Sequence, residues 1–581
     1  MVKYKKIIFI VLCLITAFSV YGEDGQWKTL FHESEVEFKL QHYQQAIKIS
    51  KKALIVAVKK EHKYVPFSVL QLGQLYQVQG QYKKAASIYK LVADKFKNSQ
   101  NENKQFAGIA YKFLAEVYGV QNKYSEAEYF DKKAIKIFSD VLGEYSSFVL
   151  STSEHLAFIC QKKGQFDKSE GLYKKLIEKY QGSIKKYSKD YIVLLDDFAS
   201  LYDIRWRFVE AKELHEKAFK LSREYLNDNH EIVAIISNSY GVHYVLRGVN
   251  KAAEPFFKKA LAIMENKFGK NHPKTLNSLN HLGRLYIDNG NYNHAKSVIN
   301  KSLSVIEVNH IDNKEEKSFT YTNLANFYFK TGNYKKSEEL FTSILQDEIK
   351  TLGPKNYKTA NTMSNFASVY YEQDKYNEAE KLAKQSLDIY ENFYGEMYFG
   401  IISNLITLAD INTSHHKYTQ AKKYLNRALS ITENKIPATS PQIAKVKNTM
   451  GMYYLYKYNL VEAEKYLTEA LVLRKKLLGE KHPSIISSYN NLGLLKDMSG
   501  DYAKSKEYYL RSITLADEIL PENHPSKAIY LNNLASLYID KKEKDKAYPL
   551  LERVLAININ LFGKESSRAL VAKERLKKIE S

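Results

Sequence analysis

The sequence predicts an all-α, right-handed superhelical α-solenoid of about 12–13 helix-turn-helix repeats with a C-terminal capping helix. The first observation is an apolar residue that recurs every 42 residues, at positions 72, 114, 156, 198, 240, 282, 324, 366, 408, 450, 492 and 534. The second is that the position after it holds only Gly or Ala in all twelve units. Twelve units in register without an insertion indicate a repeat array. We call them repeats 1 to 12 and the apolar residue the reference position.

Each unit is predicted to be a pair of helices. Around the reference residue Leu282, the residues Leu282, Gly283 and Tyr286 fall on one face of a helix. Gly290 then ends that helix, and Ala295 and the residues after it begin a second apolar stripe at helical spacing. The small residue marks a place where two helices approach closely.

This skeleton resembles the tetratricopeptide repeat, and its closest likeness is to the kinesin-light-chain type. The family's usual period is about 34 residues, so the additional residues of each unit are expected in longer helices or connections. The matching motifs are Leu72-Gly73-x2-Tyr76, Ala85-x3-Tyr89, Ala253-x3-Phe257, the linkers Gly269-Lys-Asn-His272-Pro273 and Gly479-Glu-Lys-His482-Pro483, and Asn532-Asn533-Leu534-Ala535. The resemblance implies the fold, but it implies no single function, because such repeats occur in motor adaptors, scaffolds and signalling proteins.

The N-terminal residues 1–22 are predicted to be a secretory signal peptide. Lys3, Lys5 and Lys6 precede an apolar run over residues 7–18, and acidic residues follow Gly22. An uncleaved anchor is the alternative, but the run is shorter than the roughly 20 residues that a spanning helix needs. We therefore expect an exported protein, periplasmic, envelope-associated or secreted, with no transmembrane segment after cleavage.

The repeat array is predicted over residues 61–565, between two atypical ends. Residues 23–60 resemble a degenerate N-terminal repeat, in which Glu33 and Ser34 replace the apolar and small residues. Leu576 continues the reference column, but Lys577 fills the small position and prevents another helix from packing there. Residues 566–581 are therefore predicted to form a C-terminal capping helix, since end repeats of a solenoid face water.

The charge balance favours acidic partners over nucleic acid. Lys and Arg number 87 against 65 for Asp and Glu, a formal net charge of +22, and only 11 of the cations are Arg. Such a surplus attracts acidic proteins or anionic envelope surfaces. Lysine without stacking motifs reads nucleic acid poorly. A merely solvated basic surface is the alternative.

No catalytic residue, cofactor site or metal site is predicted. The sequence contains none of the common nucleophile, zinc-protease or phosphate-binding motifs, and repeats with their caps use nearly the whole mature chain. His415 and His416 are adjacent in a predicted turn, but no further ligand lies at a suitable spacing. Cys160 occupies a core position, which predicts a structural thiol. We expect a protein that is not an enzyme.

The first helix of each repeat is expected to line a concave groove. In proteins that this chain resembles, Asn just before the reference position holds the backbone of an extended peptide, and an amide both donates and accepts hydrogen bonds. The alternative is that Asn recurs because the whole chain is rich in Lys and Asn. The candidate partner-binding residues are Asn280, His281, Arg284, Asn323, Asn326, Lys330, Asn365, Asn491 and Asn533.

The predicted function is that of an exported, non-enzymatic scaffold or adaptor that binds a protein or extended peptide in this groove, and both an acidic and a non-acidic partner are open. The alternative is a secreted or envelope factor that acts on host proteins or anionic envelope polymers through its basic surface. Salt distinguishes the two, because binding to a polyanion weakens steeply as ionic strength rises.

Overall fold

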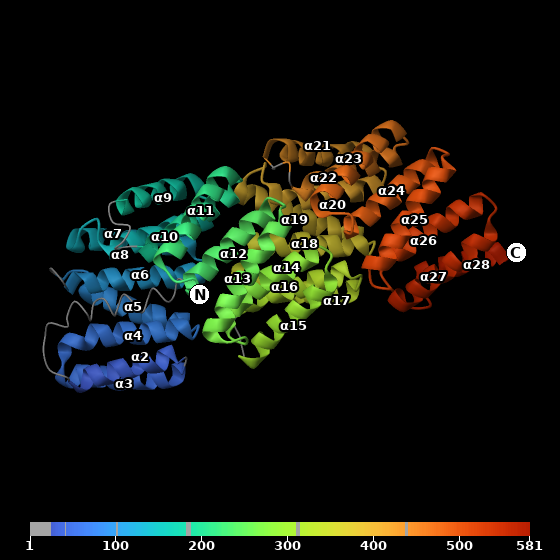
Figure 1. Ribbon diagram of the computed structural model, residues 1–581. Helices are drawn as coiled ribbons and strands as arrows, with labels where there is room; N and C mark the ends of the chain where they lie inside the picture. The colour runs from blue at the N-terminus through green and yellow to red at the C-terminus, as the bar shows by residue number, and fades with distance from the viewer. Residues whose placement is uncertain are drawn as a thin grey trace. The chain divides into compact units, whose positions relative to one another are not determined.

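The structure, a computed structural model, describes residues 25–40, 42–99, 103–181, 188–309, 314–435, 438 and 440–580. Within these ranges the chain forms α-helices and short 3-10 turns, and no strand. Consecutive helices lie side by side in pairs (Figure 1). The predicted all-α solenoid is therefore confirmed, while the predicted signal peptide, residues 1–22, lies outside the described ranges.

The helices follow the 42-residue units. The first helices of repeats 1 to 12 are α4 (Val65–Val78), α6 (Lys104–Val120), α8 (Ser147–Lys162), α10 (Ser188–Ile204), α12 (Glu231–Leu246), α14 (Leu276–Asp288), α16 (Lys314–Lys330), α18 (Tyr357–Glu372), α20 (Ile402–Ser414), α22 (Pro441–Tyr456), α24 (Pro483–Met498) and α26 (Pro525–Asp540). The second helices are α5 (Tyr82–Phe96), α7 (Tyr124–Leu142), α9 (Phe166–Tyr180), α11 (Phe208–Tyr225), α13 (Asn250–Phe268), α15 (Tyr292–Val308), α17 (Tyr334–Leu352), α19 (Tyr376–Tyr394), α21 (Tyr418–Lys435), α23 (Leu460–Leu478), α25 (Tyr502–Ile519) and α27 (Lys544–Phe562). The pair α2 (Gln26–Lys39) and α3 (Tyr43–Lys60) precedes them, α28 (Ser567–Glu580) follows, and the 3-10 turns η1 (His62–Tyr64), η3 (Pro273–Thr275) and η4 (Phe399–Ile401) lead into α4, α14 and α20.

The small residue after the reference position lies where the two helices of a repeat meet. A Cβ atom built on Gly241 would lie 2.5 Å from Phe257, and one on Gly73 would lie 2.5 Å from Tyr89. Gly283 is different, because the nearest atom to its Cβ would belong to Ile299 at 3.5 Å, an ordinary contact distance. The side chain that the second helix places against this position therefore decides how strictly a glycine is needed.

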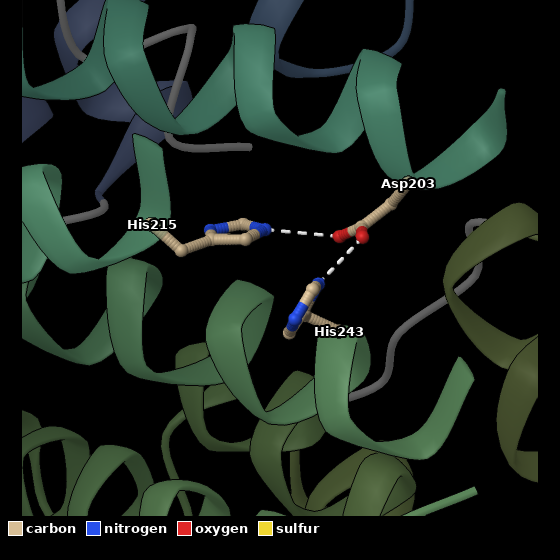
Figure 2. Close-up of side chains that lie close together, drawn as sticks. All are labelled: Asp203, His215 and His243. Carbon is tan, nitrogen blue, oxygen red and sulfur yellow. Dashed lines mark hydrogen bonds and ion pairs between the residues drawn. The ribbon is translucent and has the colours of Figure 1, made fainter. Parts of the chain in front are cut away.

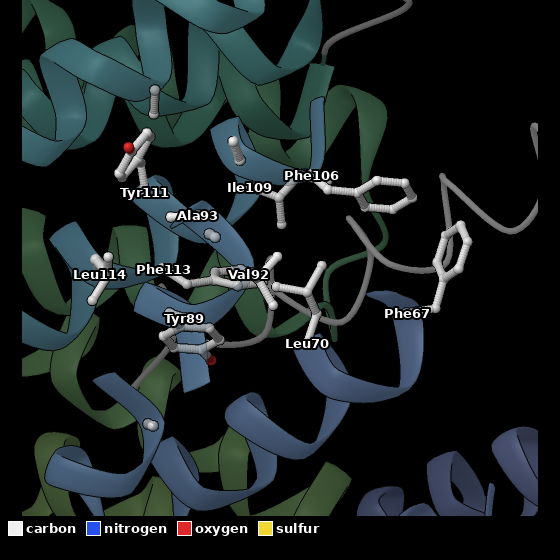
Figure 3. Close-up of a cluster of buried hydrophobic side chains, with 14 of the residues drawn as sticks. Phe67, Leu70, Tyr89, Val92, Ala93, Phe106, Ile109, Tyr111, Phe113 and Leu114 are labelled. Atoms are coloured by element: carbon white, nitrogen blue, oxygen red, sulfur yellow. The ribbon is translucent and has the colours of Figure 1, made fainter. Parts of the chain in front are cut away.

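The chain divides into two compact units, residues 1–197 and 198–581. In the first unit, aromatic rings from neighbouring repeats form a continuous core (Figure 3). The Tyr89 and Phe113 rings lie 5.2 Å apart, and the buried Tyr89 hydroxyl donates a hydrogen bond to the Gln77 side chain at 2.9 Å. Cys160 is fully buried in α8, and burial raises the pKa of its thiol.

In the second unit, the turn inside one repeat contacts the start of a first helix five repeats later. We call these contacts the seam. In two places a turn glycine packs against a proline. In each, the histidine directly before that proline donates a hydrogen bond from Nε2 to the last carbonyl group of the helix that ends at the turn. The seam consists of Trp206 with Phe399, Gly290 with Pro483, Gly332 with Pro525, Asp374 with Arg568, and the hydrogen bonds from His482 to the Asp288 carbonyl (2.9 Å) and from His524 to the Lys330 carbonyl (3.1 Å).

Candidate functional site: the first-helix face of repeats 6 to 10

Most of the predicted groove amides are hydrogen-bonded between first helices of neighbouring repeats. Each bond spans 43 residues, from the Asn before a reference position to the residue two before the reference position of the preceding repeat. The Nδ2 groups of Asn323, Asn491 and Asn533 donate to the Asn280 carbonyl (2.8 Å), the Asn448 Oδ1 (3.2 Å) and the Asn490 Oδ1 (2.9 Å), respectively. These amides therefore tie one repeat to the next.

Asn280, Asn323 and Asn326 are buried, with 4%, 1% and 7% of their surfaces exposed. Asn280 also accepts a hydrogen bond from the Thr320 hydroxyl at 2.9 Å, and Asn326 donates to the carbonyl of Thr322 in its own helix at 2.9 Å. Within its own repeat, Asn323 does not lie on the helix face that packs against the second helix. The first helix of the preceding repeat nevertheless covers this position, because the helices stack.

Asn365 in α18 departs from this pattern. Its side chain is partly exposed, and it forms no hydrogen bond with any described residue, although Asn365 occupies the same repeat position as Asn323. Its amide is therefore available to an outside partner. Among the candidate amides, it is the one that the fold leaves for binding.

His281 and Arg284 are held by neighbours on α13, α14 and α16. The His281 ring stacks on Phe257 with centroids 5.1 Å apart and meets Phe319 edge-on at 5.3 Å. Burial lowers the pKa of His281 to about 4, so its ring is neutral at pH 7. The Arg284 Nε donates to Asp288 at 2.8 Å, and this carboxylate raises the pKa of the guanidinium.

Four charged side chains lie on the same face of consecutive first helices, at positions five before, two after or six after the reference position. We call this face the inward stripe. Lys330, Glu372 and Lys445 are exposed, Asp410 is partly exposed, and among the described residues none of the four side chains forms an ion pair or a hydrogen bond. They belong to α16, α18, α20 and α22, in the sign order plus, minus, minus, plus. We call these four residues the charged row.

The side chains of the charged row reach water, but enough protein surrounds them to desolvate their charges partly, and the charges are electrostatically coupled. Burial raises the pKa of Asp410 to about 7, and the Glu372 carboxylate acts in the same direction while Lys445 opposes it. Desolvation lowers the pKa of Lys445 to about 8, and the Lys330 cation contributes to this decrease. Burial also raises the pKa of Glu372, against the effect of Lys330. Such perturbed groups without a direct partner are typical of sites that receive a ligand.

Lys330 and Asn365 were predicted from the sequence to bind a partner, whereas Asp410 and Lys445 were not. The signal was present, because Asp410 lies two residues after a reference position and Lys445 five before one, both on the inward stripe of the first helix. Extending that stripe through repeats 9 and 10 finds them. Their electrostatic coupling required the stacked helices.

In the part of the chain that the structure describes, no helix combines the length and the apolar character needed to cross a bilayer.

Comparisons with known proteins identify the repeat. A sequence profile described as tetratricopeptide repeat matches residues 66–140, 207–266, 232–307, 317–392, 442–518 and 498–560, which together make up more than half of the chain. No curated protein sequence matches significantly.

Several solved structures resemble this chain weakly. The APC/C hetero-tetramer Cut9-Hcn1 is 14% identical over 96% of this chain and 97% of that chain, with a TM-score of 0.49. A Rap protein complexed with Competence and Sporulation Factor is 17% identical over 60% of this chain and 98% of that chain (TM-score 0.43). Repeats of a putative kinesin light chain from Podosopora anserina are 20% identical over 36% and 98% (TM-score 0.28). The profile match, which covers more than half of the chain, establishes that this chain belongs to the tetratricopeptide repeat family.

Proposed function

We propose that this protein is an exported, non-enzymatic scaffold that binds a protein or extended peptide along the charged row and Asn365. Tetratricopeptide repeats serve protein binding by presenting the first helices of successive repeats on one surface. The predicted signal peptide at residues 1–22 supports export, and sequencing the N-terminus of the exported protein tests it. A mature chain that begins at or near Glu23 is expected, and one that begins at Met1 would contradict export with cleavage.

The observation that carries this proposal is the charged row itself. These side chains reach water, but protein atoms surround them and they form no ion pair or hydrogen bond with the described residues, so their charges are incompletely solvated and this costs free energy. A ligand that brings complementary charges removes part of that cost, so its binding is favoured. Lys330 and Lys445 at the two ends suit acidic side chains, and Glu372 and Asp410 between them suit a basic one. The Asn365 amide, also on α18, suits the peptide backbone because it both donates and accepts.

Identification of the partner comes first. The mature protein would be used to capture binding proteins from an extract of its own cells, and captured proteins would be identified by mass spectrometry. Affinity of the purified partner would then be measured for wild type, for Lys330→Ala/Lys445→Ala and for Asn365→Ala. We expect at least tenfold weaker binding for the double variant and a smaller loss for Asn365→Ala.

A matched control separates this site from general charge attraction. Lys296→Ala/Lys301→Ala removes the same charge from exposed positions on α15, which is a second helix. The proposal requires this control to bind as wild type does. If both double variants lose affinity equally, and if binding to wild type falls steeply with salt, the basic surface rather than the charged row binds the partner.

A further inference from the structure

Among the described residues, one group of three potential metal ligands converges, and it lies buried in repeats 4 and 5. Asp203 on α10 lies between the rings of His215 on α11 and His243 on α12 (Figure 2). The two histidines are fully buried, and 4% of the Asp203 surface is exposed. Two nearby histidines and a carboxylate converge in a protein interior, where an ionisable group normally has a specific reason to be.

The repeat columns show how unusual these residues are. In the other eleven repeats, the column of His243 holds an aliphatic or aromatic residue, such as Leu285. The column of His215 likewise holds apolar or aromatic residues, such as Phe257, in every other repeat except at Asp131. Both substitutions therefore place a metal-ligating side chain where the fold requires only an apolar one, and both meet at the same carboxylate.

The geometry of the cluster is compact. The Nε2 atom of His215 lies 2.9 Å from one Asp203 oxygen, and the Nδ1 atom of His243 lies 2.6 Å from the other. Although burial alone would raise the pKa of Asp203, the hydrogen bonds from the two rings lower it, so the carboxylate is ionised. The His243 Nε2 atom, on the far side of the ring from Asp203, is buried without a hydrogen-bond partner among the described residues.

We propose that Asp203, His215 and His243 bind a divalent transition-metal ion, with zinc as the best chemical match. Two imidazoles and one carboxylate are a ligand set that zinc commonly uses, with a fourth position left for water. Zinc bonds to nitrogen and oxygen are about 2.0–2.2 Å long. Tetrahedral ligation with bonds of this length places donor atoms about 3.3 Å apart, so each ring nitrogen must move away from the Asp203 oxygen that it now contacts by roughly 0.4–0.7 Å as the ion enters.

When both histidines are neutral, they can bind the metal ion without releasing a proton to solvent. The proton that each ring now directs at Asp203 moves to the other nitrogen of the same ring, and the freed nitrogen binds the ion. Because the ligands come from three helices, the ion joins α10, α11 and α12. Its role is to stabilise the junction between repeats 4 and 5, since full burial keeps a substrate away from it.

The test uses the untagged mature protein, freed of metal with a chelator. We expect one equivalent of zinc per chain by elemental analysis, a thermal unfolding midpoint several degrees higher with zinc, and a visible absorption band characteristic of nitrogen and oxygen ligation when cobalt is bound instead. The variant His215→Phe/His243→Leu restores the residue types of the other repeats. It should keep the helical circular dichroism spectrum and lose all three metal effects.

A control variant, His415→Ala/His416→Ala, removes the exposed adjacent histidines, which could also attract metal. It should bind one equivalent as wild type does. The proposal is overturned if metal-free wild type takes up no zinc, or if His215→Phe/His243→Leu binds and responds as wild type does. Should that double variant fail to fold, the uptake of zinc by wild type and the cobalt spectrum decide alone, since a spectrum without histidine ligation rejects the site.

Discussion

At the scale of single residues, the space left by the second helix decides which small residue a repeat accepts. Gly241 faces the fully packed ring of Phe257, whereas Gly283 faces the slimmer Ile299. Both glycines lie in the same column and in the interior of a first helix. They therefore form a matched pair in which helix propensity is equal and packing differs.

Gly241→Ala should lower the free energy of unfolding by about 1–3 kcal/mol, because the added methyl group overpacks the contact with Phe257. Gly283→Ala should instead raise it by about 0.5–1 kcal/mol, because alanine favours helix and its Cβ meets only ordinary contacts. Thermal and denaturant unfolding of both variants measures this. Equal effects of the two substitutions would show that packing does not distinguish these sites.

The pKa of Asp410 gives a second test at this scale. Because the folded-state pKa is raised to about 7, from about 3.9 in an unfolded chain, stability that is present at pH 4 is lost as the pH rises toward 7. Asp410→Asn does not titrate, so it should match wild type near pH 4 and exceed it by on the order of 1–2 kcal/mol above pH 7, a figure reduced because water reaches part of the carboxyl. Unfolding curves from pH 4 to pH 8 measure the difference, and one independent of pH would contradict the assignment.

At the scale of elements, the linker motif His-Pro both starts a helix and closes the seam. The Nδ1 atom of His524 accepts a hydrogen bond from the Ser526 amide at 3.1 Å, which caps α26. Its Nε2 atom donates to the backbone carbonyl of Lys330 at the end of α16. Pro525 packs on Gly332 at the same place. His482 and Pro483 repeat this arrangement at the start of α24.

Alanine substitutions at two turn glycines distinguish the stabilisation that the seam contact provides from the effect of backbone strain. Gly332 and Gly500 occupy the same repeat position with φ values of +83° and +78°, so alanine is strained similarly at both. A Cβ atom on Gly332 would lie 2.2 Å from Pro525, while nothing lies within 4 Å of one on Gly500. Gly332→Ala should therefore destabilise more than Gly500→Ala, by roughly 1–3 kcal/mol. Equal unfolding midpoints would mean that the contact with Pro525 contributes nothing.

At the scale of the whole chain, the seam links repeats that are 194 residues apart in sequence, which no single repeat interface can do. Burial lowers the pKa of His524 to about 4 and also lowers that of His482. For a base with a lowered folded-state pKa, stability is present above the unfolded pKa near 6.5 and is lost as the pH falls through the folded value.

We therefore expect the seam to loosen between pH 6.5 and pH 4. Hydrogen exchange at the ends of α14 and α16, corrected for the intrinsic pH dependence, should become faster over this range in wild type. His482→Asn/His524→Asn keeps a capping side chain that does not titrate, so it should show little change with pH. Equal acceleration in both proteins would assign the effect to other groups.

The sequence by itself determined the fold class, the twelve repeat units and the family. It could do so because the 42-residue period, the small residue and the helical stripes are local patterns, which recur wherever two helices pack in the same way. The same patterns placed Lys330 and Asn365 on the inward stripe.

Only the tertiary structure decided which of those inward residues are free. It buried Asn323 beneath the preceding repeat, left Asn365 and the charged row without hydrogen-bond or ion-pair partners among the described residues, and brought Asp203, His215 and His243 together from three helices. The reason is physical. Stacking between repeats and the contacts of the seam depend on how helices are placed in space, and neither the spacing of residues in one repeat nor its composition specifies that placement.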